Sequence, residues 1–248
     1  MNRAQSDTIG FVLVFSLIVL TVGTVYAMGF PALQELRTGE QLENMERAFT
    51  VLDDNVDDMA RDGAPSRATE IKLNGGTLAV DSETTIRIRA EEVGNASNNV
   101  TVNATSQPIT YREGNTVVAS SYGAVFRQDG DASVMRERPG WVVDDDHALV
   151  PLVVTSRSGD RAALGGSSTI LVRSTVIGRG VAGELASDSG VQVNVTVSSP
   201  RAEAWKRYFE SEGLAPVDSD ASDGEITYQF TVDSLVVQQT TVAVELTS

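Results

Sequence analysis

The chain has 248 residues, which is enough to bury a sizeable core, either as one large domain or as one domain with a stem. Lys and Arg number 19 against 34 Asp and Glu, a formal net charge of -15, which argues against nucleic-acid binding because phosphates require clustered cations. The chain has no cysteine, so disulfide bonds, thiolate metal sites and a cysteine nucleophile are excluded.

The N-terminal segment from Thr8 to Gln34 carries no charge, and the run from Ile9 to Phe30 is almost continuously apolar. A helix that spans a bilayer needs about 20 such residues, whereas the apolar core of a cleavable secretory signal has roughly 7–15. No A-x-A cleavage pattern follows the run. We therefore predict a retained transmembrane helix from Ile9 to Phe30. Arg3 should keep the N-terminus in the cytoplasm while the acidic remainder of the chain is exported.

The helix is expected to continue past the bilayer as a stalk and to cover residues 5–62. The segment Asp62-Gly63-Ala64-Pro65 should stop it, because Gly favours a helix C-cap and Pro cannot continue a helix. Fewer than three good heptads favour packing of this part on the protein's own β domain over a coiled coil with a second copy. The apolar stripe that would pack recurs at spacings of three and four residues: Leu42, Met45, Phe49, Leu52, Val56 and Met59.

After Pro65 the apolar period changes to two, which predicts an extracellular β-rich domain over residues 66–248. Ile71–Leu73 and Leu78–Val80 should form a β-hairpin through Asn74-Gly75-Gly76. Pro151 places its strand on an edge or at a strand start. The other expected strands are Ile86–Ile88, Val100–Val102, Ile109–Tyr111, Val117–Val118, Val125–Phe126, Val150–Val154, Thr169–Val176, Val191–Val197, Glu225–Val232 and Val236–Leu246.

One short helix is predicted at about residues 200–212, with Ser199 as its N-cap, Pro200 in its first turn and Gly213 at its end. Its aromatic face is expected to anchor the helix on the sheet; sugar or partner binding is the alternative. The expected fold class is therefore α+β: a long N-terminal hydrophobic helix followed by an antiparallel, pilin-like or sandwich-like β-rich domain with one short helix.

Four N-glycosylation sequons mark candidate sugar sites, at Asn95, Asn99, Asn103 and Asn194. The first three fall within eleven residues, a density that suits an exported surface, although a Thr-rich strand with Asn turns produces such clusters without sugar. We expect at least one of the four to be occupied.

The chain shows no clear motif for catalysis, for a cofactor or for a metal. His147 is the only histidine and follows Asp144-Asp145-Asp146, which we interpret as a solvated acidic turn because zinc needs further ligands at suitable spacing. The segment from Asp218 to Gly224 lacks the register of a calcium loop and is also interpreted as a solvated loop. The sequence therefore predicts a protein that is not an enzyme. Paired carboxylates for glycoside hydrolysis cannot be placed from sequence, so an anchored hydrolase stays as a distant alternative.

The segment from Arg3 to Gly10, RAQSDTIG, resembles the class III signal of haloarchaeal type IV pilins, in which a basic residue and Ala or Gly precede a Ser-containing hexapeptide ending Ile-Gly. The resemblance implies that a prepilin peptidase cuts between Ala4 and Gln5, which removes leader residues 1–4 and leaves the apolar helix on the mature protein. Asp7 stands where many relatives have Pro. An unprocessed signal anchor with the same topology is the alternative.

Two further stretches, GAVFRQDG and SSPRAEAWKRYFES, are similar to those of uncharacterised haloarchaeal pilin-like exported proteins. Lys72 and Lys206 are the only lysines, and such an acidic, lysine-poor composition resembles that of proteins from extreme halophiles, the alternative being an ordinary acidic secreted domain. These resemblances imply a non-catalytic subunit or minor component of an archaeal type IV filament, with the lipid bilayer, the prepilin peptidase and other pilin-like subunits as partners. A membrane-anchored extracellular binding module that does not polymerise is the second hypothesis.

Overall fold

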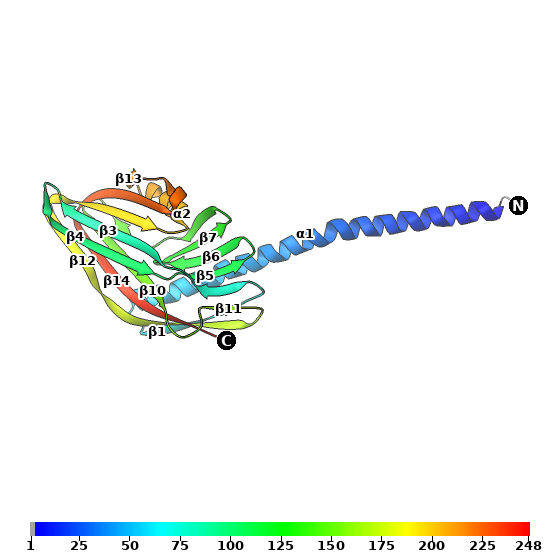
Figure 1. Cartoon of the computed structure of the whole chain (residues 1–248), viewed down its shortest axis with the longest axis horizontal. Coiled ribbons are helices and arrows are strands. Elements are labelled where there is room, and N and C mark those ends of the chain that lie inside the picture. The colour runs from blue at the N-terminus through cyan, green and yellow to red at the C-terminus, as the bar shows by residue number, and fades with distance from the viewer. Residues whose placement is uncertain (1–2) are drawn as a thin grey trace. The chain divides into compact units, whose positions relative to one another are not determined.

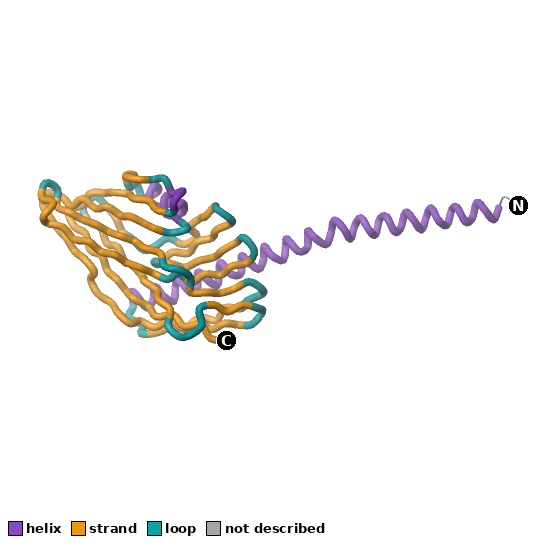
Figure 2. Tube along the Cα trace, viewed as in Figure 1, coloured by secondary structure: helices purple, strands orange, loops and turns teal. Residues whose placement is uncertain are grey.

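The computed structural model describes residues 3–248, and for residues 3–8, 29 and 31–37 it describes the backbone alone. The protein is α+β: one long helix, one short helix and a mostly antiparallel β structure, which confirms the fold class expected from the sequence (Figures 1 and 2). The chain divides into two compact units, Met1–Asn44 and Met45–Ser248. We call the second unit the head.

The long helix α1 spans Arg3–Arg61 without interruption, so its last 17 residues, 45–61, belong to the head. It ends one residue before the predicted stop segment, where Gly63 adopts a φ of +81° that favours glycine. Within the head the predicted apolar stripe of α1 is buried, which supports packing on the protein's own β domain over a coiled coil. Its buried members there are Met45, Phe49, Leu52, Val56 and Met59.

The head contains two β-sheets, joined by connections that cross between them (Figure 1). The eight-stranded sheet has the order β4-β3-β12-β14-β10-β9, with β1 paired to β12 and β13 paired to β14. Its strands are β1 (Ser66–Lys72), β3 (Thr84–Glu92), β4 (Asn95–Ser106), β9 (Val142–Val143), β10 (His147–Arg157), β12 (Thr169–Ser198), β13 (Ala215–Asp218) and β14 (Glu225–Thr247).

The six-stranded sheet has the order β11-β2-β5-β6-β7-β8 and is antiparallel throughout. Its strands are β2 (Thr77–Val80), β5 (Ile109–Glu113), β6 (Thr116–Ser121), β7 (Ala124–Asp129), β8 (Ala132–Glu137) and β11 (Ala163–Gly165). A short helix α2 (Ala202–Ser211) and a 3-10 turn η1 (Ala221–Asp223) lie between β12 and β14 in the chain.

The predicted hairpin of residues 71–80 is wrong, because β1 and β2 belong to different sheets. β1 pairs with β12, and β2 pairs with β11 and β5. Where the chain crosses between the sheets, Leu73 N donates to Ser168 O at 3.0 Å and Gly75 N to Gly166 O at 3.2 Å. Each half of the predicted hairpin is therefore held by the returning chain at residues 163–175 rather than by the other half.

Two pairs of predicted strands are each one continuous strand. The predicted strands Thr169–Val176 and Val191–Val197 are both part of the 30-residue β12, and Glu225–Val232 and Val236–Leu246 are both part of the 23-residue β14. β12 and β14 pair along their lengths, with register shifts at three places between Val176 and Val191. Glycines and small polar residues at 178–190 broke the apolar period, but the backbone ladder continues through them as bulges.

One pairing is parallel: β10 lies alongside β14 over its whole length. On its other side, β10 pairs with β9 only at Ala148 and Leu149. Pro151 lies just past this short pairing, where β10 forms an edge on that side, as the missing N–H of proline predicts. Farther along, Gln107 N, just after β4, donates to Thr155 O of β10 at 2.8 Å. The edge strand β4 therefore approaches β10, which lies near the opposite edge of the large sheet.

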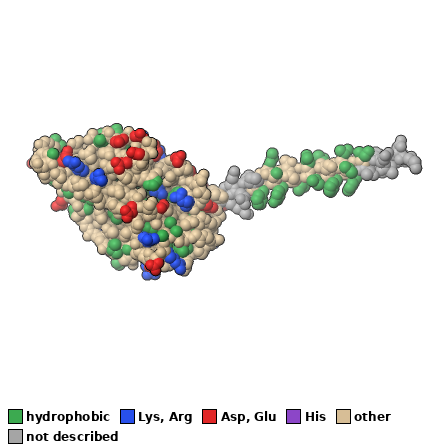
Figure 3. Space-filling view, viewed as in Figure 1, with side chains coloured by type: hydrophobic (Ala, Val, Ile, Leu, Met, Phe, Trp, Pro, Cys, Tyr) green, Lys and Arg blue, Asp and Glu red, His purple; other side chains and the backbone are tan. Residues whose placement is uncertain are grey.

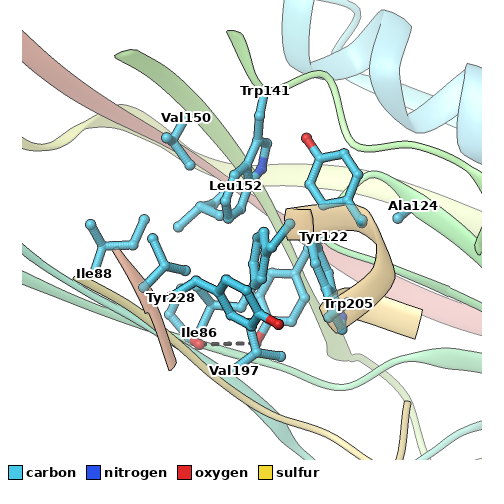
Figure 4. Packing of buried hydrophobic residues seen from close by; sticks show 14 of the residues in the cluster. Ile86, Ile88, Tyr122, Ala124, Trp141, Val150, Leu152, Val197, Trp205 and Tyr228 are labelled. Carbon is cyan, nitrogen blue, oxygen red and sulfur yellow. Dashed lines mark hydrogen bonds between the residues drawn. The ribbon is translucent and has the colours of Figure 1, made fainter. Parts of the chain in front are cut away.

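The main hydrophobic core lies between the large sheet, the small sheet and α2. Trp205 of α2 is 1 % exposed and packs against Phe126 and Trp141, with ring centroids 5.6 and 5.8 Å apart. Figure 4 shows Trp205, Tyr122 and Tyr228 gathered beside the strand residues Ile86 and Val197. The aromatic face of α2 is thus a packing face, as predicted.

The start of α2 differs from the prediction. Its N-cap residue is Arg201, without a side-chain capping bond, and Ser199 instead forms a turn before the helix in which its Oγ accepts from Arg201 N at 3.1 Å. The predicted end is correct, because Gly213 follows the helix with a φ of +78°.

Candidate functional site

The apolar part of α1 is the most distinctive surface of the first unit. Ile9–Met28 has a mean hydropathy of 2.4 and is long and apolar enough to cross a membrane. None of this segment is buried in the structure, and its apolar side chains stand outward along the helix (Figure 3). Phe30, the predicted end of the transmembrane run, stacks on Tyr26 with ring centroids 5.6 Å apart.

The two threonine hydroxyls of this segment are satisfied within the helix. Thr21 Oγ1 donates to Leu17 O at 2.9 Å, and Thr24 Oγ1 donates to Leu20 O at 2.8 Å. A helix that carries its own hydrogen bonds and presents a continuous apolar surface is suited to hydrocarbon or to other apolar helices. The predicted processing residues Ala4 and Gln5 lie in the helical backbone of α1, and their side chains lie outside the described residues.

The head end of α1 is built into the β structure, and we call residues 45–61 with the strands they contact the helix seat. Glu46 accepts from Arg127 Nη1 of β7 at 2.8 Å and from Arg136 Nε of β8 at 3.0 Å. Farther along the helix, Asn55 Nδ2 donates to Thr69 Oγ1 of β1 at 3.0 Å. At the last turn, Arg179 of β12 donates to the carbonyl oxygen of Met59. The seat therefore ties the helix to both sheets.

A single carboxyl group interrupts the buried face of the seat. Asp53 is 7 % exposed and accepts from Ser120 Oγ of β6 at 2.9 Å. Burial raises the pKa of Asp53 to about 7, with smaller contributions from Asp57, Asp54 and Glu137 in the same direction. The sequence interpretation missed this residue, although an aspartate beside Leu52 within an apolar stripe was a signal that could have found it.

A cavity of about 280 Å³ lies where the last turns of α1 meet the loop before β9 and the strands β10 and β14. Asp57 and Arg61, which form an ion pair at 3.0 Å, line one side, and Tyr122 with Gly123 of the β6–β7 turn line another. Burial raises the pKa of Asp57, and the neighbouring Arg61 lowers it by less.

Tyr122 joins the turn between β6 and β7 to the large sheet. It is a non-glycine residue with a φ of +57°, and its hydroxyl shares its one proton between Thr84 O at 2.7 Å and Ala104 O at 2.9 Å. Both acceptors are backbone carbonyls of the adjacent strands β3 and β4. The strained turn is therefore held in place by two buried hydrogen bonds at the centre of the head.

The predicted sugar sites share one region of the large sheet. Asn95, Asn99 and Asn103 are exposed on the edge strand β4, whereas Asn194 lies on β12 in the middle of the sheet and is half-buried. Asn103 pairs with Arg87, and Asn194 pairs with the nearby Arg89 on β3, so both face the outer side of the sheet.

The environments of the amide nitrogens separate the sequons. Asn95 Nδ2 donates to Glu92 Oε2 at 2.9 Å, and Asn99 Nδ2 donates to Ala96 O at 2.9 Å. Asn103 is bound through its oxygen instead, since Oδ1 accepts from Arg87 Nε at 3.0 Å. A glycan is attached to Nδ2 of asparagine. At Asn95 and Asn99 this nitrogen is engaged in a hydrogen bond, whereas at Asn103 the described bond is made by the oxygen.

The acidic segments are turns held by their own carboxylates. Asp144 Oδ1 accepts from the backbone N–H of Asp146 and His147, and these bonds lower the pKa of Asp144. The ring of His147 bonds to Ser234 Oγ at 2.9 Å through Nδ1. Asp220 likewise accepts from Ser222 N in the exposed loop before β14. Among the residues that the structure describes, no group of three or more His, Cys, Asp or Glu side chains is placed to hold a metal ion.

Comparison with known proteins places these features in a family. Residues 3–245 match the sequence profile of DUF7289, described as a family of unknown function. The chain belongs to the DUF7289 family. Because the match runs from residue 3 to residue 245, both the apolar segment of α1 and the head are parts of the DUF7289 architecture.

A more distant similarity points to an archaeal protein. An uncharacterized protein of Archaeoglobus fulgidus is 24% identical over 81 residues, which are 33% of this DUF7289 chain and 27% of the relative. The alignment thus spans about a quarter of the relative's length. No solved structure matches the chain.

Proposed function

We propose that this protein is a non-catalytic, pilin-like structural subunit or minor component of an archaeal type IV filament or related cell-surface assembly. One observation carries the proposal: a single uninterrupted helix presents an exposed apolar surface at one end and is built into a β-rich head at the other. In this proposal the apolar end rests in the bilayer before assembly, with the N-terminus in the cytoplasm and the head outside the cell.

The apolar segment is suited to leave the bilayer and enter a bundle of like helices during assembly. Its exposed surface, Ile9–Met28, requires an apolar environment, and a bundle of like helices replaces lipid without returning that surface to water. Because the hydroxyls of Thr21 and Thr24 bond within the helix, neither environment leaves these two groups unsatisfied. Assembly by helix exchange is therefore chemically consistent with this chain.

The signal-like segment supports processing on the cytoplasmic side. Cleavage between Ala4 and Gln5 by a prepilin peptidase leaves Ile9 and the remainder of the apolar helix on the mature protein. The archaeal relative and the acidic, lysine-poor composition support an archaeal, halophilic source, in which dense carboxylates keep the head hydrated.

The second candidate is a membrane-anchored extracellular binding module that does not polymerise. The same apolar segment serves it as a simple anchor, and the polar outer face of the large sheet, which includes Asn103, Arg87 and Asn194, supplies an exposed surface. An anchored surface hydrolase is a third possibility without a specific observation in its favour.

The N-terminus of the mature protein and the cell surface together test the proposal. The full chain is expressed in a haloarchaeal host with and without its prepilin peptidase, and the N-terminal peptide is identified by mass spectrometry. We expect Gln5 as the first residue only when the peptidase is present, and surface filaments that bind an antibody against the head. Asp7→Pro, which introduces the residue common among similar signals, should increase the processed fraction.

The outcomes separate the candidates. A start at Gln5 together with labelled filaments supports the filament subunit. Processed protein that stays in the membrane as a monomer favours the binding module. An intact Met1 in all cells, with no filaments, contradicts the filament proposal.

A further inference from the structure

The helix seat contains one buried acid that directly joins α1 to a strand. Asp53 lies between Leu52 and Val56, both of which are buried, and the one described hydrogen bond of its carboxyl group is the bond that it accepts from Ser120 Oγ at 2.9 Å. Side chains alternate along β6: Val117 and Ala119 point into the main core. Val118 and Ser120 therefore point to the opposite face of the strand, where α1 lies. The pair therefore sits inside the contact between the helix and the small sheet.

The charged groups that act on Asp53 are all negative. Asp54 and Asp57 stand on α1 itself, and Glu137 lies on β8, where its Oε1 accepts from Thr50 Oγ1 at 3.4 Å. Three cations of the seat pair with other acids, Arg127 and Arg136 with Glu46 and Arg61 with Asp57, and Arg179 donates to a backbone carbonyl oxygen. Within the described part of the chain, the Ser120 hydroxyl is the hydrogen-bond donor to an ionised Asp53. The charged groups that shift the pKa of Asp53 include no cation.

We propose that Asp53 and Ser120 form a proton-operated latch, in which a neutral Asp53 holds residues 45–61 of α1 on β6 and an ionised Asp53 loosens them. A neutral carboxyl group shares a hydrogen bond with the hydroxyl and costs little to bury. A buried carboxylate beside three other acids has only the Ser120 hydroxyl to compensate it, and this hydrogen bond lowers the pKa of Asp53 by less than burial raises it. Fuller hydration of the carboxylate requires the helix to move from the strand. The cavity lined by Asp57 and Arg61 lies along the same helix and gives the seat internal space next to solvent-accessible groups.

The direction of the effect follows from the pKa of Asp53, which burial raises to about 7. Between the ordinary pKa of an aspartate and this value, the folded head keeps a proton that the unfolded chain has released. The stability that this proton supplies is complete at acid pH, and it is lost as the pH rises through about 7. The seat is therefore firm in mildly acidic medium and loosest in alkaline medium.

The experiment measures the seat in the full chain, reconstituted in lipid nanodiscs, as a function of pH. Hydrogen exchange of the amides of residues 45–61, corrected for the intrinsic rate at each pH, reports opening of the helix. We expect the opening equilibrium constant to rise by up to about tenfold per pH unit between about pH 5 and pH 7 in the wild type. Asp53→Asn keeps the shape and cannot ionise, so its opening constant should not change over this range.

Two variants and one direct measurement complete the test. Asp58→Asn removes an exposed carboxylate on the same helix that is not among the groups acting on Asp53, and it should keep the pH dependence of the wild type. Ser120→Ala, which removes the hydroxyl, should raise opening at every pH. Should Asp53→Asn fail to fold, infrared difference spectra of the wild type still follow the carboxyl band, using protein with labelled aspartate carboxyl carbons.

The proposal is overturned by either of two results. The first is an Asp53→Asn protein with the same pH dependence of exchange in residues 45–61 as the wild type. The second is an infrared titration in which no aspartate stays protonated above about pH 5, the upper limit for ordinary exposed aspartates.

Discussion

Arg127 Nη1 donates to Glu46 Oε1 at 2.8 Å, which joins β7 to α1 through an ion pair whose side chains are 25 % and 17 % exposed. Glu46 also accepts from Arg136, so one carboxylate on the helix holds two neighbouring strands of the small sheet. The contact resists sliding of the helix along the sheet, because both partners are charged and largely shielded from water.

Glu46→Gln should therefore lower the free energy of unfolding of the head by about 1–2 kcal/mol. Loss of the charge removes the attraction to both arginines while the amide keeps the shape. Thermal unfolding followed by fluorescence of Trp141 and Trp205, both in the core, measures the change. Glu203→Gln, in the exposed pair with Arg207, is the matched control and should cost less than about 0.5 kcal/mol. Equal losses in the two variants would contradict the importance of the Glu46 contact.

Tyr122→Phe should destabilise the head by about 1–3 kcal/mol, because two buried carbonyl oxygens, of Thr84 and Ala104, lose their donor while the ring stays in the core. Urea unfolding at constant pH measures the difference. Tyr228→Phe, whose hydroxyl donates to Glu210 Oε1 at 3.1 Å in a partly buried site, should cost less. A Tyr122→Phe protein as stable as the wild type would show that these hydrogen bonds contribute little.

Gly76→Ala tests the crossing between the two sheets. Gly76 has a φ of +67°, and a Cβ atom there would lie 2.6 Å from Arg112 O and 2.7 Å from the Tyr111 ring. Gly94→Ala shares the positive φ, at +84°, but meets nothing within 4 Å, so it isolates the conformational cost of about 1 kcal/mol. We expect Gly76→Ala to lower the free energy of unfolding by at least about 1 kcal/mol more than Gly94→Ala does, because the backbone at Arg112 must shift to make room for the Cβ atom. Equal thermal unfolding midpoints for the two variants would show that close packing of Gly76 against Arg112 and Tyr111 does not limit the residue at this position.

Asn103→Gln should remove more glycan mass than Asn95→Gln or Asn99→Gln when the protein is produced in an archaeal host that attaches N-glycans. The amide nitrogens of Asn95 and Asn99 donate to Glu92 and Ala96, whereas Asn103 is held through its oxygen by Arg87. Intact-protein mass spectrometry compares the three variants with the wild type. Full occupancy of Asn95 with an unmodified Asn103 would contradict this ranking.

Local rules predicted the features that depend on nearby residues. The end of α1 before Gly63, the end of α2 at Gly213 and the burial of Trp205 all follow from a glycine or an apolar period within a few positions. The apolar segment of α1 could also be predicted from the sequence, because its length and composition alone define it.

Features that depend on distant partners were not predicted. The strands on either side of Gly75 and Gly76 looked like one hairpin, yet both pair with the chain at residues 163–175, some ninety residues away. The parallel pairing of β10 with β14 has no signature in a period-two pattern, which is the same for either direction. The position of Asp53 beside Leu52 was a local signal of burial, but its partner Ser120 lies 67 positions later in the chain and could not be identified from the sequence.

The position of β14 has a consequence for how the head folds during synthesis. This C-terminal strand lies in the interior of the large sheet, with β12 on one side and β10 on the other, and Thr247 pairs with Leu171. The large sheet cannot be completed until residues 225–247 have been synthesised, by which time the N-terminal helix has long left the ribosome. Each newly made molecule therefore passes through an interval in which β10 and β12 lack their shared neighbour, and premature termination within β14 should leave a chain that is degraded rather than folded.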